Sequence, residues 1–585
     1  CPALRFGERF ITRVVALLAL VSAARKQHAD APPPAPDPGY EEAPELPAEK
    51  AIRFYAAQRK PLRVRAITSL VVSLVLVWVS FGLPLAGALG SSVRVAALFC
   101  LAAECCVMLV GLDVVTHGIT AFLQGSPNGE SLIVFSCFTT ALDALWTAIF
   151  GGGSRGLPFC AVSALSLSFA LWGGEMYCAG LRTSMRALIL GHNPSIITAT
   201  RDPETGTKHL FKSHSDTEGF IRQSEETDVC EELASVTAPF LMIASLLLAF
   251  VASVLRGAPG DFFHVLGAMG AVCAPFSLLY AFPLIFSRCA RRLLQIGVGI
   301  AGWSGVREFG GKTRLIITDS DVFPPNTIAI DSVRILEGVY TDRVISYAGS
   351  VLSAAGSGLA PLFTDLMRRN GYSMQQIDNF TICEGGIRAL IRGEEVAIGA
   401  NGFMNLCGLR IPRKLRTSNA VFISISGTLV GVFGIRYAAI PAVQDALVTL
   451  LRGKRSPIFA IRDFNVDPLL IRQKFKLSTE GFHFPSFAER YRLSSLEADK
   501  PRRYAAVLAR SGLSPFVEAA ERGSRLYRST RFCAFLSLLC SVFGLLLMFL
   551  LCWNSSYESA SAANLITYMM LWMIPLGVMH FWTRQ

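Results

Sequence analysis

Eight apolar runs, each about 20 residues long, constrain this chain more than any other feature. A helix needs about 20 apolar residues to cross a hydrocarbon layer about 30 Å thick. Of all residues, 52% are hydrophobic and 17% are charged, whereas soluble domains are nearer about 25% charged. We therefore expect an integral, multi-pass membrane protein in contact with lipid. The predicted spans are 66–88, 93–115, 131–150, 157–178, 236–255, 262–286, 532–553 and 562–582.

The net charge of +12 comes largely from Lys and Arg beside these runs. Basic residues in short flanking loops mark the cytoplasmic side, so we expect both termini in the cytoplasm and no binding of nucleic acid. Most of the 15 cysteines lie in apolar runs, where Cys behaves as a small hydrophobe. The sequence contains no C-x-x-C pair, so it does not indicate a zinc site. The chain begins at Cys1 instead of Met, so we expect residues before it.

Two polar insertions separate the spans. Residues 179–235 are polar and mixed in charge, which predicts a solvated connector. Residues 290–528 alternate strand and helix patterns, which predicts a parallel α/β sheet. Reactive residues in such sheets lie at the carboxyl ends of strands. The polar residues placed there are Asp319, Asp321, Asp463 and Asn465.

The stretch from Gly270 to Thr327 joins a membrane span to this soluble region. It contains a span broken by Pro275 and Pro283, then a basic cluster, then an apolar strand that stops at Asp319. This order resembles the P-type ATPases, specifically the heavy-metal-transporting branch. The resemblance implies a multi-span α-helical membrane protein with a cytoplasmic α/β haloacid-dehalogenase-like domain and an inserted α+β nucleotide-binding-type domain. By family habit it lies in a bacterial plasma membrane.

The resemblance also implies the domain boundaries. An N-terminal segment with a Pro- and acid-rich linker covers 1–62. A membrane domain of about six spans covers 63–289, with a reduced actuator-like insertion at 179–235. The split phosphorylation-type domain covers 290–335 and 416–528, the nucleotide-binding-type domain covers 336–415, and the last two spans lie in 529–585.

The family's phosphorylated aspartate opens a DKTGTLT motif. Asp321 and Thr327 match its first and last letters, and Asp319 starts the other register. Both aspartates are therefore candidate phosphorylation-site equivalents, with a helix-capping or acidic-loop role as the alternative. The lysine of the motif is missing, and Pro324 and Pro325 remove two backbone N–H donors.

Two further catalytic motifs are altered, and one further catalytic residue of the family has a counterpart. Lys500 aligns with the phosphate-contacting lysine. The GDGxND motif that holds Mg²⁺ in the family is absent after Gly512, and no aspartate follows Asp499. TGES, whose Glu positions the hydrolytic water, is replaced by residues 216–219, Asp-Thr-Glu-Gly. Phosphoryl transfer depends on neutralisation by a metal ion, so these changes predict loss of the phosphorylation cycle.

Residues 378–412 resemble the nucleotide-binding domain of the family. The aligned nucleotide-binding residues are Gly385, Gly386, Gly399 and Asn401. The resemblance implies ATP and Mg²⁺ as cofactors. The alternative is a hairpin that only packs, because Glu384 replaces the first glycine of the motif.

The membrane spans hold four candidate site residues. Pro275 occupies the proline position of the family's CPC motif, but both thiol positions are apolar, so no bound metal is expected there. Cys273 lies one position early and is either a lone ligand or a packed small residue. Glu104 and Asp143 fall inside spans, where a carboxylate costs about 2.5–3.5 kcal/mol. They are candidates for cation binding, proton exchange or an interhelical hydrogen bond.

These patterns together favour a pseudo-ATPase that lacks the phosphorylation cycle, with nucleotide binding and a regulatory or scaffold role. The first alternative is a divergent ATP-driven heavy-metal cation transporter. The second is an ion- or proton-coupled membrane protein that uses intramembrane acids. The sequence does not specify the protein partner.

Overall fold

The computed structural model describes residues 45–82, 92–151, 156–191, 193–201, 206–214, 217–336, 338–415, 419–453, 455–495 and 503–582. The apolar run near the N-terminus, Asp216 of the scrambled motif and Lys500 lie outside these ranges.

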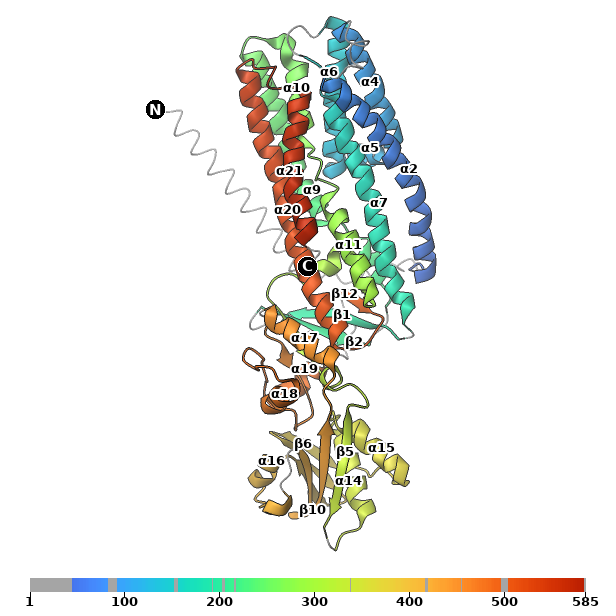
Figure 1. The fold of residues 1–585 in the computed structure, drawn as a ribbon, viewed down its shortest axis with the longest axis vertical. Coiled ribbons are helices and arrows are strands. Elements are labelled where there is room, and N and C mark those ends of the chain that lie inside the picture. The colour runs from blue at the N-terminus through green and yellow to red at the C-terminus, as the bar shows by residue number, and fades with distance from the viewer. Residues whose placement is uncertain are drawn as a thin grey trace, which may run out of the picture. The chain divides into compact units, whose positions relative to one another are not determined.

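Six helices in the described ranges are long and apolar enough to cross a membrane. They agree with six of the eight predicted spans, and Figure 1 shows them side by side. They are α2 (Ala48–Ser80), α4 (Val93–Val110), α6 (Gly129–Phe150), α9 (Val229–Phe250, continued to Leu255 by the π-turn η1, Val251–Leu255), α20 (Leu513–Trp553) and α21 (Ala562–Trp582).

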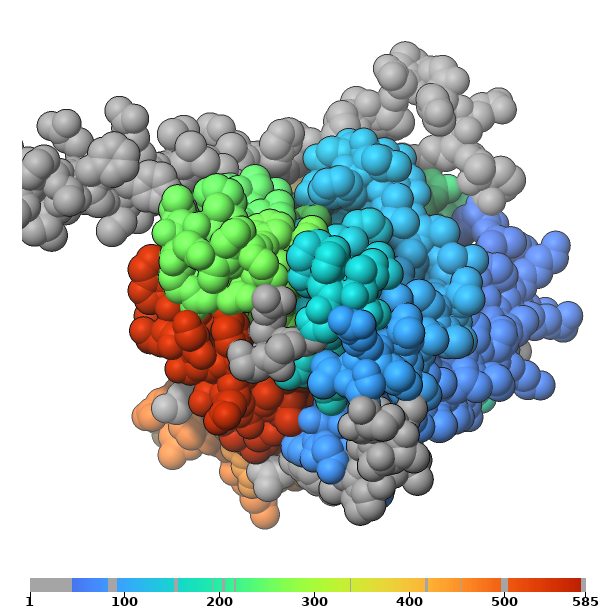
Figure 2. All heavy atoms as spheres, turned by 90° about the horizontal axis from the view of Figure 1, so that it is seen from above, coloured from blue at the N-terminus to red at the C-terminus, as the bar shows by residue number. Residues whose placement is uncertain are grey.

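The predicted span at 157–178 lies on α7 (Cys160–Leu190), which is not among those six helices. This helix packs against α2, α4, α6 and α11 (Ala281–Gln295). In Figure 2 it lies between the blue N-terminal helices and the red C-terminal ones. Because protein surrounds it, α7 carries small and polar buried residues such as Ser163, Ser166 and Ser168. Its low hydropathy therefore reflects burial within the bundle.

The predicted span at 262–286 is broken in the middle. Helix α10 (Phe262–Cys273) follows the 3₁₀ turn η2 (Pro259–Asp261), and α11 starts at Ala281. Pro275 has no backbone N–H and cannot continue the helix. Between the two helices the chain forms turns, with the Leu278 N–H donating to the Pro275 carbonyl at 2.9 Å. Gly173 of α7 lets this turn approach closely, since a Cβ there would lie 2.2 Å from the Leu279 oxygen.

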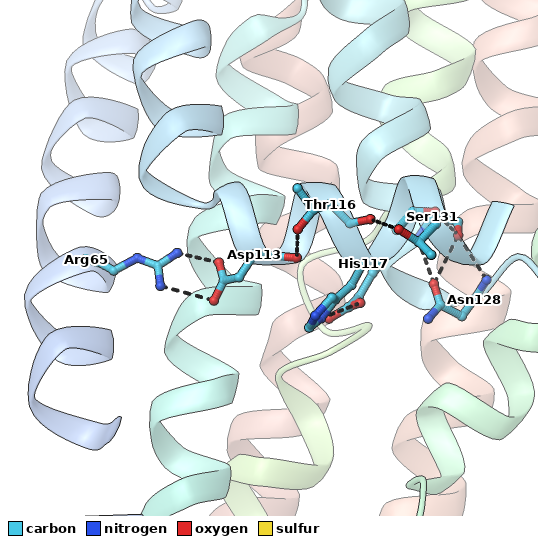
Figure 3. Close-up of polar contacts among 9 residues, drawn as sticks. Arg65, Asp113, Thr116, His117, Asn128 and Ser131 are labelled. Atoms are coloured by element: carbon cyan, nitrogen blue, oxygen red, sulfur yellow. Dashed lines mark hydrogen bonds and ion pairs between the residues drawn. The ribbon is translucent and has the colours of Figure 1, made fainter. Parts of the chain in front are cut away.

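A short apolar helix, α5 (Leu112–Leu123), follows α4 after a bend at Gly111. Figure 3 shows how polar contacts hold it: Asp113 pairs with Arg65 of α2, and the Ser131 hydroxyl of α6 donates to the Gly118 carbonyl at 2.7 Å. The predicted span at 93–115 therefore ends at this bend.

The first soluble sheet has six strands in the order β11-β4-β2-β1-β12-β3. Strands β2 and β11 run parallel to β4, while β1 is antiparallel to β2 and β12, and β12 to β3. The strands are β11 (Ile458–Phe459), β4 (Thr313–Ile317), β2 (Lys208–Ser213), β1 (Ser195–Arg201), β12 (Tyr504–Leu508) and β3 (Val298–Ile300).

The β1–β2 hairpin comes from the insertion at 179–235, which the sequence presents as a solvated connector. It lies inside the sheet, between β4 and β12, and its Ile196, Ile197 and Leu210 are fully buried. The predicted parallel sheet is therefore mixed in direction, because an antiparallel hairpin occupies its centre.

The second sheet is antiparallel, in the order β5-β10-β9-β8-β7-β6. Helices α14 (Thr341–Ala354) and α15 (Ala360–Asn370) pack on it. Its strands extend over residues 328–437, beyond the predicted 336–415. They are β5 (Ile328–Ile335), β6 (Asn379–Cys383), β7 (Gly386–Ile391), β8 (Glu394–Gly399), β9 (Ala420–Ile425) and β10 (Thr428–Tyr437).

The apolar run that starts at Val421 has the pattern of a single strand, VFISISGTLVGVFGI, but it folds as the β9–β10 hairpin. Ser426 and Gly427 both have positive φ, 49° and 75°, as a tight two-residue hairpin turn requires. The β-branched residues on both sides of the turn gave no sign of the reversal. The remaining short helices are α8 (Phe220–Ser224), α12 (Gly302–Glu308), α13 (Asp319–Val322), α16 (Asn401–Leu406), η3 (Arg413–Leu415), α17 (Pro441–Arg452), α18 (Pro468–Phe475) and α19 (Phe487–Ser494).

The fold class agrees with the prediction. The chain is a multi-span α-helical membrane protein with a mixed α/β domain and an inserted α+β domain. Helix α20 begins directly after β12 and continues without a break into a membrane span.

Replacing Gly173 by Ala is expected to lower the melting temperature of the purified protein. The new Cβ would meet the Leu279 carbonyl, and overpacking of this kind costs about 1–3 kcal/mol. Gly174→Ala is the matched control, because nothing lies within 4 Å of a Cβ there. Thermal unfolding in detergent compares the two, and equal melting temperatures would contradict the close approach of α7 to the broken span.

Candidate phosphorylation site

The predicted nucleophiles lie at the carboxyl end of β4. The strand ends at Ile317, Thr318 caps the next helix, and α13 begins at Asp319. Because β11 runs parallel to β4, the loop that follows β11 reaches the same edge of the sheet. This topology brings Asp463 next to Asp319, as the strand pattern predicts.

Asp321 is fully buried, and the protein uses both of its carboxylate oxygens. Oδ2 accepts hydrogen bonds from the backbone N–H and the hydroxyl of Thr318, each at 3.1 Å. Oδ1 pairs with the ammonium group of Lys212 on β2, whose side chain is 12% exposed. Asp321 therefore caps α13 and neutralises a buried lysine.

Asp319 accepts hydrogen bonds from the backbone N–H groups of Arg462 and Asp463, both at 2.9 Å. The turn at Gly358 packs directly on the carboxylate, because a Cβ there would lie 2.0 Å from Oδ1. Burial raises the pKa of Asp319, and the two N–H donors partly oppose that rise. Asp319 is half-buried, and both of its carboxylate oxygens accept a backbone N–H.

Asp463 is 1% exposed and lies in the same group. The Tyr437 hydroxyl donates to Oδ2 at 2.5 Å, and the Asn465 N–H donates to Oδ1 at 2.9 Å. Burial raises the pKa of Asp463 to about 7, and the nearby Asp319 adds to the rise. Near neutral pH this pair therefore carries less than two full negative charges.

Two arginines bring positive charge to the site. Arg462 donates to the Ser494 hydroxyl at 2.6 Å and lies 5.0 Å from the ring of Tyr491. Arg490 is buried, donates to the Pro485 carbonyl at 2.8 Å and stacks 4.4 Å from the ring of Phe487. Burial lowers the pKa of Arg490, and the charges of Glu384 and Asp319 act against that fall. The sequence contains no motif that identifies Arg490.

Mg²⁺ is usually held by one or two carboxylates together with water and phosphate oxygens, and the carboxylates at this edge are Asp319, Asp321 and Asp463. No group of three or more His, Cys, Asp or Glu residues able to hold a metal occurs in the part of the chain that the structure describes. Asp321 is already neutralised by Lys212, and Asp463 is held by Tyr437.

The predicted nucleotide-binding glycines gather around one aromatic ring. A Cβ on Gly386 or Gly399 would lie 2.2 or 2.4 Å from the ring of Phe403, and a Cβ on Gly385 would contact its Cβ at 3.5 Å. Phe403 is 4% exposed, so its own ring fills the space these glycines leave. Asn401 starts α16, and its buried Oδ1 has no hydrogen-bond partner among the described residues.

Glu384 belongs to the same turn, and its carboxylate accepts from the Phe487 N–H of α19 at 3.3 Å. It therefore ties the second sheet to the loop beside Asp319. The glycine cluster offers no open cradle for ATP phosphates on its Phe403 side.

The intramembrane candidates lie in two places. Cys273 ends α10 before Pro275 and is fully buried, with its thiol 3.6 Å from the Leu241 carbonyl. It borders a cavity of about 10 Å³, which is no larger than one water molecule needs. Glu104 and Asp143 are fully buried among α4, α6, α7 and α10.

No family model and no curated protein matches this sequence. Among solved structures it is similar to a zinc-transporting PIB-type ATPase in the E2.Pi state, at 12% identity and a TM-score of 0.46, over 90% of this chain and 100% of that one. The N-domain of HMA8, a copper-transporting P-type ATPase, matches at 18% identity and a TM-score of 0.17, over 18% of this chain and 98% of that one. The catalytic domain of the CPx-ATPase CopB-B matches at 15% identity and a TM-score of 0.23, over 34% of this chain and 69% of that one.

Breaking the buried ion pair by Lys212→Met is expected to destabilise the soluble domains strongly. It leaves the Asp321 carboxylate buried without its counter-charge, and removing one partner of such a pair costs about 3–5 kcal/mol. Arg369→Met is the control, because it removes one partner of an exposed pair with Asp365 and should change little. Denaturant unfolding measures both, and equal effects would refute the buried role of Lys212.

The raised pKa of Asp463 predicts a pH-dependent stability. Its folded pKa of about 7 exceeds its ordinary value of 3.8, so the folded state binds more protons than the unfolded state between these pH values. Stability should therefore fall as pH rises from about 4 to about 7. The Asp463→Asn variant should show a flatter dependence over this range, measured by thermal unfolding at a series of pH values. An unchanged slope would contradict the assignment.

Proposed function

We propose that this chain is a P-type-ATPase-like membrane protein that does not run a phosphorylation cycle, and that it acts in a regulatory or scaffold role. In the order of its helices and insertions it resembles the heavy-metal P-type ATPases. The observation that carries the proposal is the buried Lys212–Asp321 ion pair, formed between two segments that the pump family keeps in separate domains.

The first argument concerns the nucleophile. A carboxylate that attacks phosphate needs an unobstructed oxygen about 3–3.5 Å from the phosphorus, aligned with the bond that breaks. Asp321 uses both oxygens inside the fold, and Gly358 covers Oδ1 of Asp319. Asp321 therefore has no free oxygen, and Oδ2 of the half-buried Asp319 accepts from the Arg462 N–H.

The second argument concerns the segment that replaces the actuator. Strands β1 and β2 form continuous hydrogen-bonded ladders with β12 on one side and β4 on the other. A segment held at both edges moves with the sheet. It is therefore unable to act as a separate domain that brings a catalytic glutamate to the aspartate.

The third argument concerns the cofactors. Phosphoryl transfer is catalysed mainly by positioning and by metal neutralisation of the phosphate charge. Lys212 pairs with Asp321 and Tyr437 donates to Asp463, which leaves fewer free carboxylate oxygens for Mg²⁺, and Phe403 fills the glycine cluster. These features support a protein whose soluble domains no longer use ATP hydrolysis, with nucleotide binding left as a regulatory property.

A regulatory or scaffold role suits the connections between the two parts. Helix α20 links β12 to a membrane span as one 41-residue helix, and α11 leads directly into β3. The soluble sheets are therefore held rigidly by the membrane helices. We place the protein in the bacterial plasma membrane, with both termini in the cytoplasm and a protein partner on the cytoplasmic domains.

A divergent cation transporter is the second candidate. One observation favours it: Asp319 keeps the nucleophile position at the end of β4, with two backbone N–H donors and the charge of Arg490 nearby. A rearrangement that moved Gly358 away would expose this carboxylate. The two candidates differ in whether a phosphoenzyme forms.

The test is phosphorylation of the full-length protein in lipid with radiolabelled ATP and Mg²⁺. A pseudo-ATPase gives no acid-stable label above background and no vanadate-sensitive hydrolysis. Asp319→Asn and Asp321→Asn should then match the unsubstituted protein. Acid-stable label that disappears in Asp319→Asn but persists in Asp321→Asn would establish the transporter instead.

A further inference from the structure

A polar cluster built around two of the intramembrane candidates is buried among the membrane helices, away from the phosphorylation-site residues. Glu104 of α4, Asp143 of α6 and His264 of α10 are 0%, 0% and 2% exposed. The cluster involves no residue of the soluble domains. Burying one carboxylate in a membrane is costly, and here two lie close together.

The Glu104 carboxyl contacts two hydroxyls. Oε1 lies 2.6 Å from the Thr140 hydroxyl and also within hydrogen-bond reach of the Ser163 hydroxyl. Oε2 is buried and has no hydrogen-bond partner in the described part of the chain. No Lys or Arg there forms an ion pair with it.

Each hydroxyl also lies within hydrogen-bond reach of a backbone carbonyl. The Thr140 hydroxyl lies 2.8 Å from the Ser136 carbonyl oxygen, and the Ser163 hydroxyl lies 3.0 Å from the Cys160 carbonyl oxygen. A hydroxyl has a single proton to donate. If both bond to those carbonyls, a proton on the Glu104 carboxyl satisfies it by donating to a hydroxyl oxygen, and the Cys160 thiol is a further, weak donor to the carboxylate. The neutral acid avoids an unpaired buried charge.

Asp143 and His264 form the second half of the cluster. His264 Nδ1 lies 3.0 and 3.2 Å from the two carboxylate oxygens. Nε2 of His264 is buried and has no hydrogen-bond partner among the described residues. A Cβ on Gly267 would lie 2.9 Å from the Asp143 Cβ, so this glycine lets α10 approach α6.

A line of polar groups leads from His264 to the end of the bundle. Its ring centroid lies 5.9 Å from that of Tyr557, in the connection between α20 and α21. The Tyr557 hydroxyl donates to Asp261 at 2.6 Å and accepts from Arg256 at 2.8 Å. Asp261 is partly exposed. Water at this end of the helices therefore lies a few side chains away from Asp143.

We propose that Glu104, Asp143 and His264 form a proton-binding site inside the membrane domain, in exchange with water through the Tyr557 end. One proton resides on the Glu104 carboxyl, and a second is shared by Asp143 and His264. Binding and release transfer only H⁺ between these atoms and water, so no redox partner is needed. The site operates without ATP and is independent of the proposed function of the soluble domains.

A proton suits the cluster better than a metal ion. The described residues contain no group of three His, Cys, Asp or Glu able to hold a metal, whereas a proton needs only one basic atom. The other titratable groups that face Glu104 or the Asp143–His264 pair are Cys100 of α4, Cys137 of α6, Cys160 of α7 and Tyr557. None of these carries a positive charge, so the protons themselves balance the buried carboxylates.

Infrared spectroscopy of the full-length protein in lipid tests the proposal. The unsubstituted protein should show the C=O stretch of protonated carboxylic acids, shifted in D₂O because the protons exchange with water. Glu104→Gln should remove one component. Asp143→Asn and His264→Gln should each alter a second component, because each removes one partner of the shared proton. Asp113→Asn is the control, because Asp113 is a partly exposed acid paired with Arg65. This variant should change neither component of the C=O stretch.

Infrared spectra of Glu104→Gln and Asp143→Asn that superimpose on the spectrum of the unsubstituted protein would overturn the proposal.

A second measurement needs no substitution: a hydrophobic carbodiimide reacts with protonated buried carboxyls, and mass spectrometry locates the adduct. Modification of Glu104 that declines at alkaline pH supports the site. No adduct on Glu104 even at acidic pH refutes it.

Discussion

The soluble half of this protein depends on one buried ion pair between Lys212 and Asp321. A charge enclosed in a protein interior must be paired, because desolvation costs several kcal/mol for each ion. Lys212 lies on a hairpin inserted between two membrane helices, and Asp321 lies 109 residues later at the end of β4. The pair therefore ties the hairpin to the residues that follow β4, and the same contact occupies one oxygen of Asp321.

The consequences extend to the neighbouring carboxylates. With Asp321 neutralised inside the fold, Asp319 and Asp463 are the acids left at the edge of β4, and both are held by N–H or O–H donors from the protein. The turn at Gly358 and the carboxylate of Glu384 connect the second sheet to this edge. The protein's own contacts thus hold these carboxylates in place.

The membrane half follows a different rule, in which small residues bring helices close together. Gly173 admits the turn around Pro275, and Gly267 admits Asp143. Close packing excludes water, so the polar groups that remain inside must satisfy one another. The pairing of Asp143 with His264 is the result of this requirement. Because α10 also carries the break at Pro275, the polar cluster and the broken span share one helix.

The sequence by itself determined the membrane class, the approximate ends of six spans, the interruption at Pro275 and the strand that ends at Asp319. These features depend on local properties, namely the length of apolar runs, a missing backbone N–H and the periodicity of side chains. It also identified Glu104 and Asp143, because a carboxylate in an apolar run is conspicuous wherever it folds. Only the tertiary structure decided that Lys212 pairs with Asp321, that His264 joins Asp143 and that Phe403 fills the glycine cluster. These contacts join segments far apart in the chain, and no local pattern records which distant residue will supply the missing charge, donor or ring.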